Sequence, residues 1–321
     1  MKITICRRPN EIIALRPLWD SLCDPRVSTT FQDFDLNLLA AETFAGREEP
    51  LVVCAEASYG AAIVPAAVRP CDGTLRLLGE EVFDYRSFLH QGDDEVLFSA
   101  LAVLAELGMN LEVVALREPD CGRVPAGLPL FPFSAAPAVL RTQVTAAEFE
   151  LRHTRLARNL RRLQRLGLEL ATYPGGDSRL LRTIYQNKAT QDAESLFHDP
   201  VRVQFMVRAG MLKPERMEIF TLERGERIGA ALVTLLDPGV RRFYTGWFAP
   251  ELAAHSPALT LIYEVTRLSL AADLDCDYMT GEQPYKLRLA TSSMPLYKLK
   301  AAAAQLAAAV SRTATVLGQA S

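Results

Sequence analysis

Apolar and polar residues recur along the first part of the chain with the periods of short strands and amphipathic helices. Asn10 is placed to cap the first helix, and Asp93 and Asp94 open another that Gly108 closes. The pattern predicts helices over 11–22, 32–45 and 93–107, and strands over 2–6, 50–57, 60–69, 74–78 and 110–116. A stretch rich in proline and glycine, 119–137, is expected to be a connection.

The same order of elements returns after residue 145, without sequence identity between the two parts. Helices are predicted over 146–166, 177–192, 199–210 and 257–272, and strands over 168–172, 216–223, 227–236, 240–248 and 276–279. The alanine-rich tail from Lys298 is typical of a closing helix. This repeated series of helices and mainly antiparallel strands predicts an α/β (α+β) fold with two domains, residues 1–140 and 141–321.

The composition is that of a globular protein with a sizeable core. Hydrophobic residues make up 49% and charged residues 23% of 321, which excludes disordered, collagen-like and coiled-coil chains. No apolar run approaches the ~18 residues that span a bilayer, and the first residues do not resemble a signal peptide, so a cytoplasmic protein is expected. A formal net charge of −3 argues against a general nucleic-acid binder.

The residues that carry chemistry exclude several enzyme classes. The six cysteines form no Cys-x-x-Cys pair, and the four histidines do not meet them at ligand spacing, so no metal site is expected. The motifs of serine hydrolases, zinc proteases, P-loop NTPases and dinucleotide-binding dehydrogenases are absent from the sequence. Three segments remain as candidates for function.

The first segment is a basic helix face within residues 152–165. Leucines fall on one side of this helix and arginines, among them Arg158 and Arg162, on the other. Guanidinium groups suit phosphates. The face is therefore either a solvated surface or an anion site for a cofactor, a carrier-linked substrate, RNA or an anionic surface.

The second segment is the start of the helix predicted over 257–272, which follows the strand predicted over 240–248. Ser256 is a favourable N-cap, and Pro257 occupies the favoured first helical position. The free N–H groups and positive dipole end of such a helix bind phosphates without lysines. Any capped helix has this pattern, so it does not identify a ligand by itself.

The third segment, 275–288, places carboxylates, phenols and an ammonium close to the end of a short strand. The titratable groups concerned are Asp277, Glu282, Tyr285 and Lys286. Proton transfer needs such groups near one another. A loop that only ties the tail down would carry the same residues.

This third segment resembles the pattern Asp-Phe-x-x-Gly-x-x-x-Tyr-Lys of the BioF2-like (CelD/BcsL-type) acetyltransferases. These belong to the GNAT superfamily and are related to the FemAB peptidyltransferases. Shorter motifs follow in the family's order over about residues 10–300, and this joint order makes the resemblance specific. They are Trp19-Asp20-Ser21-Leu22, Phe31-Gln32, Ile63-Val64-Pro65, Leu77-Leu78-Gly79, Asp84-Tyr85, Arg158-Asn159-Leu160-Arg161-Arg162 and Ser256-Pro257-Ala258.

The resemblance implies two GNAT-like domains in tandem, with the acyl-donor site in the second. In that fold the donor, acetyl-CoA or another acyl-CoA, lies between two splayed strands, and its pyrophosphate rests on the following helix N-terminus. The matching residues here are Thr245, Gly246, Ser256, Pro257, Ala258 and Leu259. The glycines of the usual pyrophosphate loop are missing, and Ala258 replaces one of the family's glycines. The added Cβ crowds the backbone, which favours a different acyl donor or a degenerate site.

The implied reaction is transfer of the acyl group to an amine or hydroxyl of a small molecule or saccharide, with polysaccharide biosynthesis as the expected setting. Glu282 is the first candidate for the base, Asp277 the second, and Tyr285 the acid that protonates the leaving thiolate. The residues expected to hold the substrate are Lys286, Asp84, Tyr85, Arg158 and Arg162.

Two other interpretations stay open. A FemAB-type transferase that uses aminoacyl-tRNA would account for the basic face and the altered phosphate loop, and its binding would weaken steeply with salt. A non-catalytic, GNAT-derived subunit would present the same face to a partner or to anionic lipid. The acceptor and the oligomeric state do not follow from the sequence.

Overall fold

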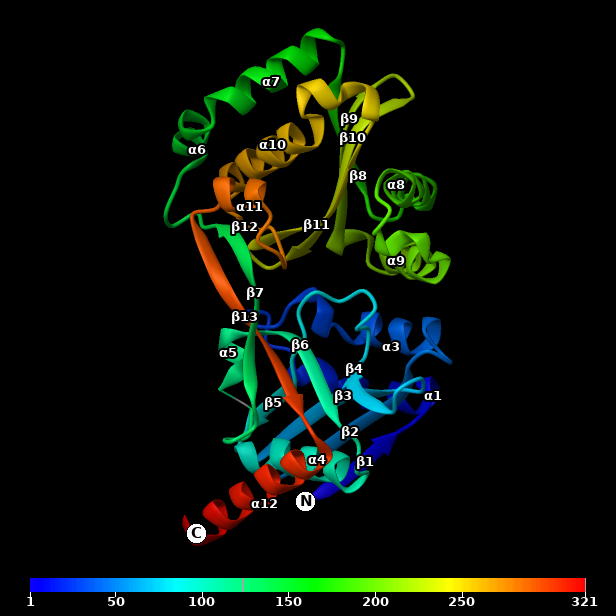
Figure 1. The fold of residues 1–321 in the computed structure, drawn as a ribbon, viewed down its shortest axis with the longest axis vertical. Coiled ribbons are helices and arrows are strands. Elements are labelled where there is room, and N and C mark those ends of the chain that lie inside the picture. The colour runs from blue at the N-terminus through cyan, green and yellow to red at the C-terminus, as the bar shows by residue number, and fades with distance from the viewer. Residues whose placement is uncertain (123, 321) are drawn as a thin grey trace. The chain divides into compact units, whose positions relative to one another are not determined.

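The computed structural model describes residues 1–122 and 124–320, which divide into two compact units (Figure 1). The first unit comprises residues 1–134 and the segment that begins at Pro295, and the second is Ala135–Met294. The strands β7 (Leu130–Val139) and β13 (Ser292–Ala301) cross the two boundaries. The division thus differs from the expected one at residue 140, because the tail returns to pair with the first unit.

The strands of the first unit lie in the order β1-β2-β3-β4-β6-β13, and β5 also pairs with β3. Neighbouring strands are antiparallel, except that β4 and β6 are parallel. The strands are β1 (Lys2–Cys6), β2 (Glu49–Ala57), β3 (Gly60–Arg69), β4 (Thr74–Leu77), β5 (Leu89–Gly92) and β6 (Leu111–Arg117).

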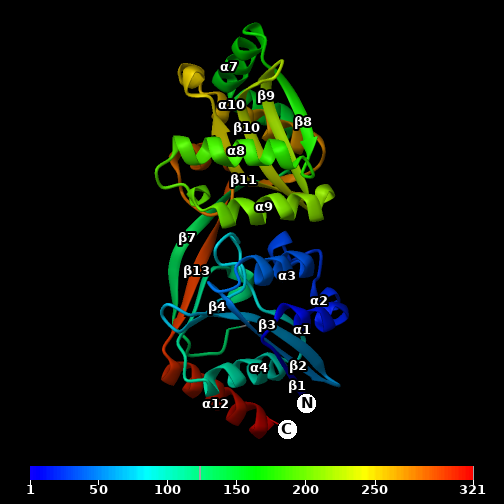
Figure 2. The ribbon, with the colours of Figure 1, turned by 90° about the vertical axis from the view of Figure 1, so that its right-hand side faces the viewer.

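Helices cover both faces of this sheet, which explains why its central strands are apolar without alternation. On β2, Leu51 and Val53 belong to the core beneath α4 and α12, whereas Val52 and Cys54 belong to the core beneath α1 to α3. Figure 2 shows these two layers of helices. The helices are α1 (Pro9–Ile12), α2 (Arg16–Leu22), α3 (Phe34–Thr43), α4 (Asp94–Glu106), α5 (Glu118–Cys121) and α12 (Ala303–Ala320).

Two sequence predictions in the first unit need correction. The helix expected over 11–22 is divided into α1, a 3-10 turn and α2, because Pro17, in the first turn of α2, has no N–H to continue the preceding helix. The N-cap of α1 is Arg8, so Asn10 lies inside the helix. The tail expected to be helical from Lys298 first completes β13, and helix α12 follows.

In the second unit the strands lie in the order β7-β12-β11-β10-β9-β8. They are antiparallel, except that β11 and β12 are parallel. The strands are β8 (Glu169–Pro174), β9 (Met217–Arg224), β10 (Arg227–Asp237), β11 (Val240–Phe248) and β12 (Asp275–Asp277).

Helices α6, α7 and α10 pack on one face of this second sheet, and α8 and α9 lie on the other (Figures 1 and 2). The helices are α6 (Ala146–Arg152), α7 (Thr154–Arg165), α8 (Ser178–Gln191), α9 (Pro200–Leu212), α10 (Pro257–Ala271) and α11 (Pro284–Leu289), with a 3-10 helix η5 (Pro250–His255) before α10. The predicted mixed α/β class, with mainly antiparallel strands flanked by helices, is confirmed.

Two further expectations in this part of the chain were wrong. The connection expected over 119–137 contains most of β7. The single helix expected over 146–166 is two helices, because His153 leaves helical geometry and its ring packs 4.5 Å from that of Phe149. No helix in the described part of the chain is long and apolar enough to cross a bilayer.

Glu48 is a buried carboxyl group in the first unit. It accepts a hydrogen bond from the Gly79 N–H at 3.0 Å. Burial raises the pKa of Glu48 from its ordinary 4.5 to about 7; this hydrogen bond opposes the shift, whereas the charges of Glu81 and Glu80 add to it. Between about pH 4.5 and about pH 7, Glu48 therefore stays protonated in the folded state, whereas the same carboxyl group is ionised in the unfolded chain.

We expect Glu48→Gln to raise the free energy of unfolding by about 1–3 kcal/mol at about pH 8, and to change it little at about pH 5. The sign follows because a raised carboxyl pKa lowers stability as the pH increases through about 7. Urea unfolding at the two pH values measures the effect. Glu49→Gln, at the exposed neighbouring position, is the control, and the same pH dependence in wild type and Glu48→Gln would contradict the prediction.

Candidate functional site

Two central strands of the second unit, β11 and β12, separate after a short stretch of parallel pairing. β11 and β12 pair only between Val240–Arg242 and Asp275–Asp277. β12 then ends, whereas β11 continues to Phe248 with β10 on its other edge. Beyond Arg242, no strand among the described residues pairs with the edge of β11 that faced β12. Its backbone groups can therefore pair with an extended ligand.

A bulge lies on β11 just after this point. Thr245 faces Val233 and Phe243 faces Thr234, so Tyr244 is the extra residue. Thr245 is buried, and Gly246 is half-buried. A Cβ at Gly246 would make only ordinary contacts, with the nearest atom at 3.8 Å, so packing does not demand glycine there.

The start of α10 presents free backbone donors. Ser256 has left-handed backbone geometry, with φ of 48°, and its exposed hydroxyl caps no backbone N–H, so the expected N-cap hydrogen bond is absent. Pro257 occupies the first turn as predicted. The N–H groups of Ala258 and Leu259 have no acceptor within the described chain. The helix dipole adds to the attraction of these groups for an anion.

The basic face of α7 is exposed, and the helix lies along α10 and contacts η5 (Figure 1). We define the basic face as Arg155, Arg158, Arg162 and Arg165. Leu163 on the opposite side is fully buried in the core. Arg158 and Arg165 donate to carbonyls of their own helix, and no carboxylate of the described residues pairs with any arginine of the face. The face therefore keeps its charge available for an anion.

Asp277 is committed to a buried ion pair. One carboxylate oxygen accepts the Met279 N–H at 2.7 Å, and the other pairs with Arg242. Arg242 also donates to Asp237 at 2.6 Å. Because both oxygens of Asp277 are engaged, its carboxylate holds the end of β12 against β11 and has little capacity left to accept a substrate proton.

Lys286 stabilises the turn that follows β12. Its buried ammonium donates to the carbonyls of Thr280 at 2.8 Å and Met279 at 3.4 Å. Met279 has a positive φ of 63°, an uncommon geometry for a residue with a side chain. The two hydrogen bonds hold this turn in place.

Glu282 and Tyr285 remain accessible in the same segment. Glu282 is exposed, and its carboxylate has no hydrogen-bond partner in the described chain. Tyr285 is half-buried against the core of the second unit. Burial raises the pKa of Tyr285 above its ordinary 10.0, so the phenol is protonated at neutral pH and is a weaker acid than an exposed tyrosine.

Asp84 and Tyr85 belong to the first unit. The Tyr85 side chain is fully buried and lies 6.0 Å from the ring of Phe31. Its carbonyl accepts a hydrogen bond from the Gln32 side chain at 3.1 Å. A ring without accessible surface has no face open to a substrate. Asp84 is half-buried.

Two residues of this region were missed in the sequence. Arg242 fixes Asp277, and a pair of arginines within an apolar strand was the available signal. Tyr185 on α8 has a fully buried hydroxyl without a hydrogen-bond partner among the described residues, and burial raises its pKa well above 10.0. Nothing in the spacing of α8 marks this tyrosine. The described residues contain no group of three or more His, Cys, Asp or Glu side chains that could hold a metal ion.

Comparison with known proteins finds a similarity over the segment that carries this site. Residues 151–287, all within the second unit, match the model of the acetyltransferase (GNAT) domain. No curated protein matches the chain. The part of the second unit that is similar to this domain includes β11, α10 and the segment from Asp277 to Lys286.

Several solved structures share the fold. A conserved protein of unknown function from Bacteroides thetaiotaomicron has a TM-score of 0.63 at 10% identity, with 94% of this chain and 100% of that chain covered. The C-terminal domain of a putative lysylphosphatidylglycerol synthetase from Agrobacterium fabrum has a TM-score of 0.59 at 12% identity, with 96% and 97% covered. FemX has a TM-score of 0.54 at 8% identity, with 81% and 90% covered. At these identities the likeness shows the fold alone.

We expect Asp277→Asn to lower the free energy of unfolding by about 3 kcal/mol, because it removes one partner of a buried ion pair. Glu282→Gln, an equivalent change in an exposed carboxylate of the same segment, is expected to alter it by less than about 0.5 kcal/mol. Urea unfolding of the two variants measures both values. Equal losses would show that Asp277 has no special structural role.

Proposed function

We propose that this protein is an acyltransferase that binds an acyl-CoA thioester in its second unit and transfers the acyl group to an amine or hydroxyl. The separation of β11 and β12 beside the free N–H groups of α10 carries this proposal. It supplies an open strand edge for the extended arm of the donor and an anion site for its pyrophosphate. Both features lie in the segment that matches the GNAT domain.

The donor would be held by backbone groups more than by side chains. The N–H groups of Ala258 and Leu259 would bind the pyrophosphate, and the exposed hydroxyl of Ser256 can add a donor. The edge of β11 around Thr245 and Gly246 would pair with the amide-containing arm. The glycines of the usual pyrophosphate loop are missing, but the Ala258 N–H has no acceptor within the described chain and is available to an anion.

The reaction would proceed by direct attack of the acceptor on the thioester carbonyl. Holding the two partners together can supply about 7–11 kcal/mol of the barrier, and a β11 N–H can polarise the carbonyl. Glu282 would take the acceptor's proton, directly or through water, because its carboxylate is uncommitted. The thiolate leaves as the new acyl bond forms, and Tyr285 would protonate it.

The finer placement among the BioF2-like acetyltransferases, with a small molecule or saccharide as acceptor, is part of this proposal. The order of the short motifs supports it. The first of these motifs has a structural role, since the Trp19 indole donates to the Gln32 carbonyl at 2.8 Å in the first unit. Arg158 and Arg162 of the basic face are then available to the phosphates of the donor.

We expect Ser256→Asp to separate donor binding from stability. Asp and Asn both tolerate left-handed backbone geometry, and a negative charge at a helix N-terminus stabilises the helix by about 0.3–1 kcal/mol. The same charge repels a pyrophosphate, so the Kd for acetyl-CoA or octanoyl-CoA should rise at least about tenfold relative to Ser256→Asn. Calorimetric titration measures the Kd, and thermal unfolding measures stability.

Unchanged affinity in Ser256→Asp would place the donor elsewhere. No heat with any acyl-CoA, from protein that unfolds cooperatively, would count against the acyltransferase itself. Asn has the same size as Asp but no charge. Comparing Ser256→Asp with Ser256→Asn therefore separates electrostatic repulsion from crowding.

The basic face favours a second candidate function, a FemAB-type transfer from aminoacyl-tRNA. Its arginines are exposed and have no carboxylate partners within the described chain. A row of guanidinium groups on one helix matches the repeated charges of an RNA backbone.

If this second candidate holds, Arg158→Gln with Arg162→Gln should reduce the slope of log K against log salt by about 1–2 for tRNA binding. Fluorescence anisotropy from about 50 to about 200 mM salt measures this slope. Arg179→Gln with Arg182→Gln, which removes two exposed charges from α8, is the matched control. An equal effect of both pairs would indicate non-specific attraction only.

A further inference from the structure

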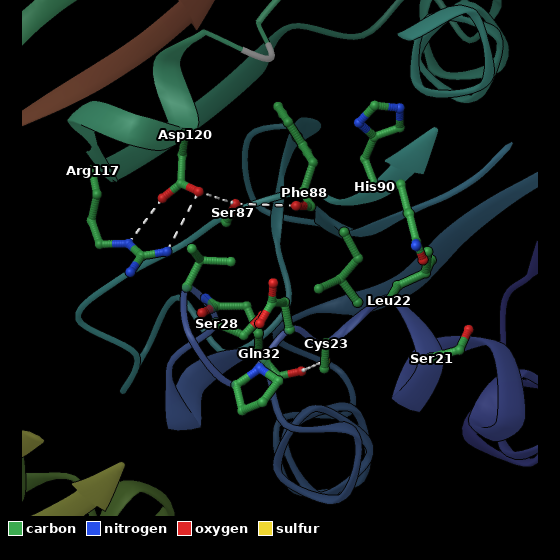
Figure 3. Close-up of a pocket in the computed structure, with 15 residues that line it drawn as sticks. Ser21, Leu22, Cys23, Ser28, Gln32, Ser87, Phe88, His90, Arg117 and Asp120 are labelled. Carbon is green, nitrogen blue, oxygen red and sulfur yellow. Dashed lines mark hydrogen bonds and ion pairs between the residues drawn. The ribbon is translucent and has the colours of Figure 1, made fainter. Parts of the chain in front are cut away.

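The first unit contains a cavity of about 410 Å³ whose walls all come from that unit (Figure 3). Its size falls within the range of about 300–1,000 Å³ that is usual for small-molecule sites. Leu22 and Phe88 contribute apolar walls, and Ser87, Arg117 and Asp120 contribute polar ones. None of these residues belongs to the matched GNAT segment.

The Arg117 guanidinium is fixed by a buried carboxylate at one end of this cavity. Asp120 accepts from the Arg117 Nε at 2.9 Å and, more weakly, from Nη2 at 3.5 Å. Asp120 also accepts from the Ser87 hydroxyl at 2.8 Å. The dashed lines in Figure 3 follow this chain of contacts. One side of the guanidinium is thus engaged by Asp120, and its orientation is set.

The other side of the Arg117 guanidinium remains free. Its Nη1 has no partner among the residues that the structure describes. The Arg117 side chain is only 12% exposed, so a ligand that reaches Nη1 meets a donor largely shielded from water, where a hydrogen bond is electrostatically stronger. Nη1 and the second proton of Nη2 form a planar fork that matches the two oxygens of a carboxylate.

Several other polar groups of the cavity are already occupied. The Gln32 amide donates to the Tyr85 carbonyl and accepts from Thr29. The His90 ring contacts the Asp93 carbonyl at 2.9 Å. Burial raises the pKa of the Cys23 thiol to about 12, so this group stays neutral. Arg117 is therefore the principal attachment point for a charged ligand.

The charge balance sets the kind of anion. Arg117 and Asp120 neutralise each other, and Asp24, which also lines the cavity, pairs with Arg26 at 2.8 Å. A phosphate dianion would bring two charges to a cavity without a net positive charge, whereas a monocarboxylate brings one and can use the free fork. The apolar walls suit a short hydrocarbon portion.

We propose that this cavity binds a small organic monocarboxylate, with its carboxylate on the free side of the Arg117 guanidinium and its hydrocarbon portion against Leu22 and Phe88. This site is separate from the donor site of the second unit and does not depend on acyl transfer. Asp120 and Ser87 act as positioning residues, since they hold Arg117 and leave the fork to the ligand.

Calorimetric titration of the full chain with butanoate, hexanoate and octanoate tests the proposal, with the corresponding primary amides and inorganic phosphate as comparison ligands. At least one carboxylate should bind about tenfold tighter than its amide, because only the carboxylate makes charge-assisted hydrogen bonds. Arg117→Met combined with Asp120→Asn should abolish binding without leaving an unpaired buried charge.

Ser28→Phe is a second variant that fills the cavity and leaves the Arg117–Asp120 pair unchanged. It should abolish binding even if the double variant folds poorly. Arg7→Met removes an exposed positive charge from the same unit and should bind like wild type. Equal affinity for acid and amide, binding that survives both cavity variants, a preference for phosphate, or no binding at millimolar concentration would each overturn the proposal.

Discussion

The arrangement of the second unit depends on one buried cation. Arg242 lies on β11 and bridges Asp237, at the end of β10, to Asp277, at the end of β12. Removing these charges from water is costly, and the cost is offset only because each group finds a partner in good geometry. The bridge stands at the last residue pair at which β11 and β12 touch. It therefore lies where the two strands separate and where the edge of β11 becomes open.

The same constraint divides the titratable side chains of the following segment into two kinds. Asp277 and Lys286 are used to hold the backbone, the first across two strands and the second around the turn at Met279. Glu282 is left exposed on that turn, whereas Tyr285 is half-buried against the core. For the proposed acyl transfer, such a rigid base would matter because positioning of the reactants contributes much of the lowering of the barrier.

Much of this architecture could be predicted from periodicity, because strands buried on both faces and helices with one apolar side leave strong patterns. β2, β3, α4 and β9 to β11 were expected within a few residues of their observed bounds. β7 and β13 were missed because they contain Pro132, Pro137 and Pro295, and proline is disfavoured in strands. Their partner strands also lie far away in the sequence. The spacing of Asp277 and Lys286 could not reveal that Arg242, 35 residues earlier, occupies the carboxylate. The Arg117–Asp120 pair was equally hidden, since Ser87, which completes it, is 33 residues from Asp120.

The return of the chain after Pro295 has a consequence for the order in which the protein is made. Leu299 and Leu306 from this last segment belong to the same core as Leu51 and Val53 near the beginning. During synthesis the whole second unit emerges from the ribosome before these leucines do. The second unit can therefore fold early, as a complete body, while the first waits with an open edge at β6 and an uncovered apolar face on α4. The first unit, whose synthesis begins first, is therefore the unit whose fold is completed last.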